Sequence, residues 1–294
     1  MKTAAWISKN TSDLHGRTVA ITGSTGGLGQ ALCRHLASLG ASLWLLDRNL
    51  PRSQAFALSL EEKYGIHVRC LTVDLADFAS VRAAAEALTS DPPDIFIHNA
   101  GAYSIPRCTC STGYDNVYQI NFVSPYYLIR TLLPSMRARN GKVIVVGSIA
   151  HRYSKTDPTD VDFSTRRAAS KVYGNAKRYL MFSLYRLFAG EHEVTLSVTH
   201  PGISFTGITA HYPPWLFAII KHPMKWIFMK PRRASLSILA GVFDQTKENE
   251  WIGPRLFDVW GLPKKSRLRS VSAAEADRIQ QNADHIYLTL SREK

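Results

Sequence analysis

The chain has 294 residues, of which 45% are hydrophobic and 20% are charged, and its formal net charge is +13. This apolar content is enough to bury a sizeable core, which excludes an intrinsically disordered chain. The basic residues are spread thinly and form no motif that reads DNA or RNA, so we expect no nucleic-acid partner. The first ten residues contain no long apolar run, which argues against a secretory signal and predicts a cytoplasmic protein.

The four cysteines are Cys33, Cys70, Cys108 and Cys110. They are too few and too scattered for a disulfide framework, so we expect reduced thiols in a reducing compartment. Neither the Cys108–Cys110 pair nor the histidines have partners at the spacing of metal ligands, and no metal is predicted.

Short β-rich apolar runs alternate along the chain with longer segments of helical period. This alternation predicts an α/β fold, a Rossmann-type doubly wound parallel sheet in a three-layer α/β/α arrangement, with residues 1–294 as a single domain. The predicted strands are 18–22, 42–46, 67–73, 95–98, 142–147 and 195–199, and the predicted helices are 28–38, 53–64, 78–88, 114–136 and 169–189.

Two stretches interrupt the alternation. Residues 149–168 are polar and charged, which predicts an excursion between a strand and the following helix. Residues 205–231 hold two apolar runs, each too short to span a membrane, and we expect them to form a substrate lid. Peripheral contact of this lid with a membrane surface stays open. Residues 246–294 are interpreted as a C-terminal extension of the same domain.

A glycine-rich string, Thr22-Gly-Ser-Thr-Gly-Gly-Leu-Gly29, lies between the first predicted strand and the first predicted helix. Glycines at this junction allow a tight turn, and backbone N–H groups at the start of the helix can bind a diphosphate. The string therefore predicts a dinucleotide site whose cofactor-binding residues are Gly23, Ser24, Thr25, Gly27, Leu28 and Gly29.

Asp47 follows the second predicted strand, about twenty residues beyond the glycines, where a carboxylate can bind both ribose hydroxyls. Such a carboxylate repels a 2′-phosphate, so the sequence favours NAD. The adjacent Arg48 could bind that phosphate if Asp47 turned away, which keeps NADP as the alternative.

Tyr173 and Lys177 lie four residues apart within a predicted helix, so they project from one face of it. A free phenol has a pKa of about 10, and a neighbouring ammonium is expected to lower it. Ser148, directly after a predicted strand, adds a hydroxyl. Together these residues indicate a set for proton transfer.

With these motifs, the chain resembles the short-chain dehydrogenase/reductase family along nearly its whole length. The matching motifs occur in the family's order: the glycine string 22–29, Val73-Asp-Leu75, Asn99-Ala-Gly101, Asn121, Ser148, Tyr173 with Lys177, and Pro201-Gly-Ile-Ser-Phe-Thr206.

The resemblance implies a role for each matched residue. Tyr173 would transfer the substrate proton, Ser148 would orient the substrate oxygen, Lys177 would hold the ribose and Asn121 would position a water. The remaining implied cofactor contacts are Asp74, Leu75, Asn99, Ala100, Gly101, Pro201, Gly202, Ile203 and Thr206.

Ser148 and Tyr173 are separated by 24 intervening residues. The longer connection resembles the retinol-dehydrogenase-like branch of the family, which implies a bulky apolar alcohol or carbonyl as substrate. Aromatic residues in the predicted lid suit such a substrate.

The hypothesis is therefore an NAD(P)-dependent oxidoreductase that interconverts an alcohol and a ketone or aldehyde by hydride transfer. The alternative is a catalytically idle protein that senses the nicotinamide or serves as a scaffold. The family pairs its subunits through the helices predicted at 114–136 and 169–189, while monomers are common in this branch, so a homodimer and a monomer both stay open.

Overall fold

The computed structural model describes residues 3–202, 229–269 and 271–292. Two predicted cofactor contacts, Ile203 and Thr206, lie outside the described residues, as do residues 205–228 of the predicted lid.

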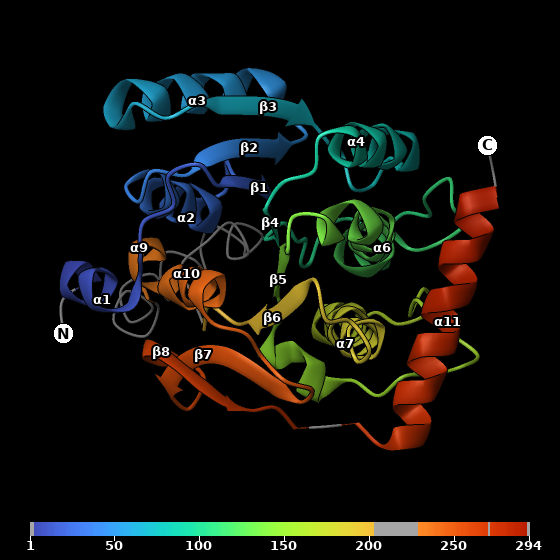
Figure 1. The fold of residues 1–294 in the computed structure, drawn as a ribbon. Coiled ribbons are helices and arrows are strands. Elements are labelled where there is room, and N and C mark those ends of the chain that lie inside the picture. Colours follow the sequence, from blue (N-terminus) through green and yellow to red (C-terminus); the bar gives the residue numbers. More distant parts are fainter. Residues whose placement is uncertain (1–2, 203–228, 270, 293–294) are drawn as a thin grey trace, which may run out of the picture.

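A single eight-stranded sheet forms the centre of the molecule, with the strand order β3-β2-β1-β4-β5-β6-β7-β8 (Figure 1). Neighbouring strands are parallel except for β7 and β8, which are antiparallel. The strands are β1 (Thr18–Thr22), β2 (Ser42–Asp47), β3 (Val68–Thr72), β4 (Ile95–His98), β5 (Lys142–Val146), β6 (Thr195–Thr199), β7 (Glu250–Leu256) and β8 (Trp260–Arg267).

Helices cover both faces of the sheet, with α2, α3 and α10 on one face and α4, α6 and α7 on the other (Figure 1). The helices are α1 (Thr3–Asn10), α2 (Gly27–Ala37), α3 (Leu50–Tyr64), α4 (Phe78–Ser90), α5 (Asn116–Tyr118), α6 (Ser124–Arg137), α7 (Ala169–Leu187), α9 (Pro231–Ala234), α10 (Leu236–Phe243) and α11 (Ala273–Arg292), with a π-helix η1 (Gln119–Val123) and a 3-10 helix η2 (Ile149–Tyr153).

The predicted Rossmann-type fold is confirmed, and local sequence signals account for its helix ends. Asn49 caps α3 by accepting a hydrogen bond from the backbone of Arg52 at 3.0 Å, and Gly65 ends that helix in the left-handed conformation, with φ of 64°. Asp77 caps α4 in the same way as Asn49 caps α3.

Side chains alternate along β5 between the two halves of the core. Val143 and Val145 pack beneath α4, α6 and α7, whereas Ile144 and Val146 pack beneath α2 and α10. Both faces of this strand are therefore buried, which explains why its sequence is one continuous apolar run.

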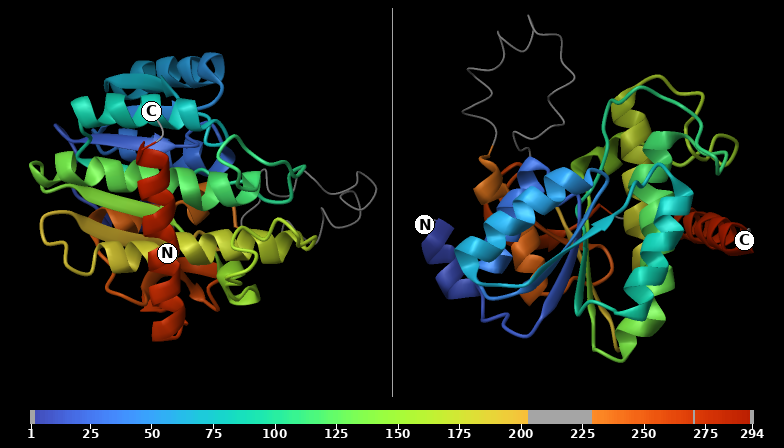
Figure 2. Two further views of the ribbon diagram at one scale, coloured as in Figure 1. Left: turned by 90° about the vertical axis from the view of Figure 1, so that its right-hand side faces the viewer. Right: turned by 90° about the horizontal axis from the view of Figure 1, so that it is seen from above.

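Helix α11 packs across the outer surface of α6 and α7, far from its neighbours in sequence (Figure 2). Glu275 accepts two hydrogen bonds from Arg178 of α7, at 2.7 and 2.8 Å, and both side chains are nearly buried. Asn282 donates to the hydroxyl of Tyr179 at 3.0 Å. The helix is thus fixed by polar contacts as well as by its apolar side.

The residues after position 245 are more than an extension, because β7 and β8 complete the sheet. Exposed cations on the edge strand β8, such as Lys264 and Lys265, conceal the strand from a search for apolar runs. The predicted helix 114–136 is instead divided into α5, the π-helix η1 and α6. The lid was predicted to end at residue 231, which is the first residue of α9. None of the described helices is long and apolar enough to cross a membrane.

Candidate active site

The predicted site residues that the structure describes lie at one edge of the sheet, where strands β1 to β6 end. In an open α/β sheet this carboxyl edge is where ligands bind.

The glycine turn after β1 has no room for side chains at two positions. Gly23 has a φ of +70°, and a Cβ added to it would lie 2.9 Å from the Cα of Ala100. A Cβ on Gly29 would lie 2.1 Å from the carbonyl oxygen of Gly23. The Asn99 amide donates to the carbonyls of Thr22 and Gly23 at 3.1 and 3.0 Å. The turn is therefore packed tightly against the start of α2 and against the loop after β4, and the N-terminus of α2 is the part that can bind a diphosphate.

Asp47 is buried, and its carboxylate faces the inside of the glycine turn. It accepts hydrogen bonds from the Ser24 hydroxyl, from the Thr25 backbone and hydroxyl at 3.2 and 2.9 Å, and from Ser53 at 3.3 Å. We expected this carboxylate to face ribose hydroxyls. Four donors from the chain itself hold it away from that role.

Two arginines lie beside this turn. Arg48 is exposed, and Arg52 donates to the carbonyl of Thr25 at 3.0 Å. Arg52 was missed by the sequence analysis, although a basic residue in the first turn of the helix after Asp47 was a usable signal.

Asp74 and Leu75 follow β3. Asp74 accepts a hydrogen bond from the backbone of Ala76 at 2.9 Å, and its side chain is partly exposed. The carbonyl of Leu75 accepts from the hydroxyl of Ser124 at 2.7 Å. These contacts fix the loop that follows β3, the neighbour of β2 in the sheet.

Ser148 and Tyr173 are brought together by η2 and α7. Ser148 caps η2 and accepts from the backbone of Ala150 at 3.2 Å. Its hydroxyl also hydrogen-bonds the phenol of Tyr173. The ring of Tyr103 stands edge-on to the ring of Tyr173, with their centroids 5.4 Å apart. The pair thus lies in a partly exposed apolar setting.

Lys177 is buried one turn further along α7. Its Nζ donates to the carbonyl of Val146 at 2.9 Å and lies 5.7 Å from the centroid of the Tyr173 ring. A Cβ added to Gly101 would lie 3.7 Å from this nitrogen and 2.9 Å from Oδ1 of Asn121. Gly101 therefore marks the point where the lysine, the asparagine and the turn after β4 meet.

Burial dominates the pKa values of this pair. It raises the pKa of Tyr173 to about 12, against the opposing effect of the hydrogen bond with Ser148, and it lowers the pKa of Lys177 to about 7. We expected Lys177 to lower the pKa of Tyr173; in this structure burial is the largest influence on the phenol, and its pKa is raised. The phenol is protonated across the neutral range.

Asn121 lies in the π-turn and locks the loop after β4. Its amide donates to the carbonyls of Ala102 and Val117, both at 2.8 Å, and its Oδ1 accepts from the backbone of Ala102 at 3.3 Å. The π-turn, a feature that often accompanies functional sites, gives this asparagine its place between α5 and α6.

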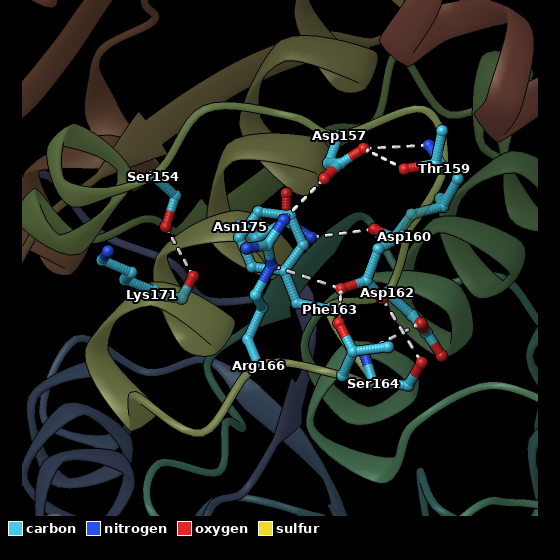
Figure 3. Close-up of polar contacts among 12 residues, drawn as sticks. Ser154, Asp157, Thr159, Asp160, Asp162, Phe163, Ser164, Arg166, Lys171 and Asn175 are labelled. Carbon is cyan, nitrogen blue, oxygen red and sulfur yellow. Dashed lines mark hydrogen bonds and ion pairs between the residues drawn. The ribbon is translucent and has the colours of Figure 1, made fainter.

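The polar excursion before α7 folds on itself through its own side chains (Figure 3). Asp157 accepts from Arg166 at 2.6 Å and from the hydroxyl of Thr159 at 2.7 Å. Asn175 of α7 donates to the carbonyl of Val161 at 2.8 Å, and Ser154 bonds the carbonyl of Lys171. The excursion is therefore tied to the turns of α7 on either side of Tyr173.

Pro201 and Gly202 follow β6 at the same edge. Gly202 has a φ of +75°, and a Cβ there would lie 2.4 Å from the carbonyl oxygen of Val259 and 2.9 Å from Cε of Met229. The turn is thus packed against the β7–β8 hairpin.

His98 was also missed by the sequence analysis, since it is the last residue of a buried strand. Its Nδ1 lies 3.1 Å from the hydroxyl of Thr22. Burial first, and then the charge of Lys177, lower its pKa well below the usual value, so the ring is neutral beside the lysine.

Comparison with known proteins agrees with this arrangement. Residues 17–215 match the family model described as short chain dehydrogenase. The chain belongs to the short-chain dehydrogenase/reductase family. Relatives named retinol dehydrogenase 14, from Mus musculus and Homo sapiens, are 28% and 27% identical to the chain and support the expected retinol-dehydrogenase-like branch.

Curated relatives are moderately similar to the chain. Dehydrogenase/reductase SDR family member 13 of Bos taurus is 33% identical over 233 residues, which cover 76% of this chain and 60% of the relative. The chain thus spans about 60% of that protein's length. Polyprenol dehydrogenase of Mus musculus is 29% identical, with 73% of this chain and 68% of the relative covered, and retinol dehydrogenase 14 of Mus musculus is 28% identical, with 74% and 70% covered.

A solved structure from Mycobacterium paratuberculosis shares the fold over 97% of this chain and 96% of its own, with a TM-score of 0.72 and 23% identity. A Pseudomonas aeruginosa complex with NADP is 26% identical, with a TM-score of 0.59, and the match covers 80% of this chain and 91% of that one.

Proposed function

We propose that the chain is a nicotinamide-dependent oxidoreductase that interconverts a secondary alcohol and a ketone, or a primary alcohol and an aldehyde, on an apolar substrate. The observation that carries the proposal is the meeting of Ser148, Tyr173 and Lys177 at the edge of the sheet that holds the glycine turn.

The residues present fit a dinucleotide. The turn around Gly23 and Gly29 leaves backbone donors for a diphosphate, and Asp74 is partly exposed for contact with the adenine. Lys177 makes one hydrogen bond within the described residues, which leaves further N–H groups for the ribose. When bound, the nicotinamide would supply or accept the hydride.

We further propose NADP(H) rather than NAD(H). Asp47 is engaged by the glycine turn, so it repels a 2′-phosphate less than a carboxylate facing the ribose would. Arg48 is exposed beside it, and Arg52 is held at the rim of the turn. An arginine fork suits a phosphate monoester. The likeness to a Pseudomonas aeruginosa protein solved with NADP supports the same choice.

In the direction of reduction, Tyr173 would donate its phenolic proton to the carbonyl oxygen, which Ser148 would orient. A phenol with a pKa of about 12 keeps its proton until the oxygen becomes basic during hydride transfer. Lys177 would help to neutralise the resulting phenolate, and its own pKa of about 7 lets it exchange protons near neutrality.

An apolar substrate is supported by the names of two relatives, polyprenol dehydrogenase and retinol dehydrogenase 14. The aromatic residues of the predicted lid, Phe205, Tyr212, Trp215, Phe217 and Trp226, lie outside the described residues, and their contribution rests on the sequence alone.

We propose that the chain does not pair through α6 and α7 as the family commonly does, because α11 packs on those helices. A monomer mass by light scattering would agree with this. A dimer would also agree with this proposal if it persisted in a variant with several charges introduced on the exposed side of α11. Such a dimer would pair through a face of the protein other than α11, α6 and α7.

The test of function follows the absorbance of the reduced nicotinamide with a panel of apolar alcohols, aldehydes and ketones. We expect turnover with NADPH, and weaker turnover with NADH. A protein that binds NADPH tightly but turns over no member of the panel would favour the sensor or scaffold alternative.

A further inference from the structure

The turn between β7 and β8 carries a bulky residue where the backbone disfavours one. Phe257 and Asp258 have φ of 53° and 59°, and the backbone of Val259 donates to the carbonyl of Leu256 at 3.0 Å. Turns with positive φ at both central positions favour Asn-Gly or Asp-Gly. A phenylalanine at the first position therefore weakens the turn, so its presence calls for a reason outside the turn itself.

The hairpin tip, residues 256–260, is also where exposed apolar surface gathers. Six large apolar side chains are exposed in the described part of the chain, and three belong to the tip: Leu256 at 43%, Phe257 at 92% and Trp260 at 40%. A fourth, Tyr153 at 59%, follows Arg152, which pairs with Asp258 of the tip at 2.8 Å. Scattered exposed residues need no explanation, but a cluster indicates a contact surface.

The flank of the tip is basic. A surface cavity of about 540 Å³ lies beside it, and its lining includes the cations Lys9, Arg255 and Lys264 and no carboxylate. None of the three forms an ion pair within residues 3–202, 229–269 and 271–292. The other lining residues are Trp6, Asn10, Leu256, Leu262 and Pro263.

The tip lies at the same edge of the sheet as the candidate active site, because β7 runs parallel to β6 and ends there. His200, directly before Pro201, bonds the carbonyl of Asp258 through its Nε2 at 2.9 Å. Arg152, which pairs with the carboxylate of Asp258, follows Ser148 by four residues. The tip is thus held firmly to the segments that carry the site.

We propose that the hairpin tip docks on the surface of an anionic phospholipid bilayer. Phe257, Leu256 and Trp260 enter the boundary between headgroups and acyl chains, while Arg255 and Lys264 contact lipid phosphates. An apolar wedge beside unpaired cations has the two features that hold peripheral proteins at such a surface. A partner protein would be expected to offer acidic groups and a fitted pocket. An anionic membrane supplies the acidic groups as lipid phosphates all over its surface and needs no fitted pocket.

The proposal is independent of the proposed function, since it concerns a surface and not the reaction. If both hold, the site faces the phase in which an apolar substrate dissolves.

The first test measures flotation of the full chain with vesicles of phosphatidylcholine alone and of phosphatidylcholine with phosphatidylserine. We expect binding to the anionic vesicles that weakens as salt is added. The variant Phe257→Asn should bind them about tenfold more weakly, because the buried area of a phenylalanine is lost. Its melting temperature should be equal or higher, since asparagine suits positive φ.

The matched control is Leu58→Ser, which removes an exposed apolar side chain of α3, 67% exposed, outside the tip. It should leave vesicle binding unchanged. A folded Phe257→Asn protein that binds as well as the unchanged chain would overturn the proposal.

A second test removes the flanking charges together, with Lys9, Arg255 and Lys264 each replaced by glutamine. We expect most of the preference for phosphatidylserine to disappear. The same loss in a control with Lys63, Lys247 and Arg278 replaced would mean that net charge alone drives binding, which contradicts a defined docking site. If the unchanged chain binds no vesicles and Phe257→Asn alters its mass by light scattering, the tip serves a second copy and the proposal fails.

Discussion

Two buried charges at the carboxyl edge of the sheet differ in how the protein satisfies them. Asp47, after β2, is surrounded by donors from the glycine turn and from α3. Lys177, on α7, has one hydrogen-bond acceptor among the described residues, the carbonyl of Val146, and burial lowers its pKa to about 7. The carboxylate is thus committed to the fold, whereas the ammonium has donors left for a ligand.

This contrast shows that the position of a residue in a motif does not by itself establish its role. Asp47 occupies a position where the sequence predicts a cofactor contact, yet its neighbours use it to brace the turn. A buried charge with unused hydrogen-bonding capacity is a better indicator of function than a charge at the right spacing.

The largest expected effect tests whether Asp47 is structural. Asp47→Asn replaces one accepting oxygen by an NH2 group, which cannot accept a hydrogen bond from the surrounding donors. We therefore expect the free energy of unfolding, measured by urea denaturation, to fall by about 3 kcal/mol. The control Asp77→Asn, at the exposed cap of α4, should change it by less than about 0.5 kcal/mol, because asparagine caps equally well. Unchanged stability in Asp47→Asn, together with a lost discrimination between NADH and NADPH, would restore the ribose-binding role.

Lys177 offers the opposite test, through the pH dependence of stability. Its pKa is about 7 when folded and about 10.5 when unfolded, so the unfolded chain binds more protons between these values and folding gains stability as pH rises through them. Relative to Lys177→Met, the unchanged protein should gain at least about 2 kcal/mol between about pH 6 and about pH 9. A flat difference would mean that the lysine is not desolvated. Lys171→Met, on the exposed side of the same helix, is the matched control, and its stability should depend on pH in the same way as that of the unchanged protein.

A smaller effect is expected on cofactor choice. Arg48→Ala should weaken NADPH binding about tenfold and leave NADH binding unchanged, because only NADPH carries the 2′-phosphate. Titration calorimetry gives both affinities. Arg34→Ala, an exposed arginine on α2, serves as the control. Equal losses for both nucleotides would exclude Arg48 as the selecting residue.

Much of the fold follows from the sequence, and the reasons are local. Five of the six predicted strands are largely apolar and buried, whereas β3 contains the exposed Arg69 and Thr72. The predicted ends of all six differ from the structure by at most one residue. Strands β7 and β8 were missed, since Pro254 and the cations of β8 do not suit a strand pattern. The cations are tolerated because β8 is an edge strand with one unpaired side, and Pro254 is tolerated because it lies beyond Ile252, where β7 pairs with β6.

For the site, motif spacing predicts that Ser148, Tyr173 and Lys177 come together, and the structure places them so. The orientation of Asp47 could not be predicted, because it depends on hydroxyls from Ser24, Thr25 and Ser53 that converge only after folding. The pKa of Tyr173 depends likewise on burial, which spacing alone does not give.

The most direct test of the account is single-turnover hydride transfer from NADPH to an apolar carbonyl by Tyr173→Phe. We expect the rate to fall by at least about a thousandfold, while the affinity for NADPH changes less than about threefold, because the phenol donates the proton and the ring remains. Tyr64→Phe, at the far end of α3, should react at the unchanged rate. Hydride transfer by Tyr173→Phe within about tenfold of the unchanged protein would contradict the assignment of Tyr173 as the proton donor.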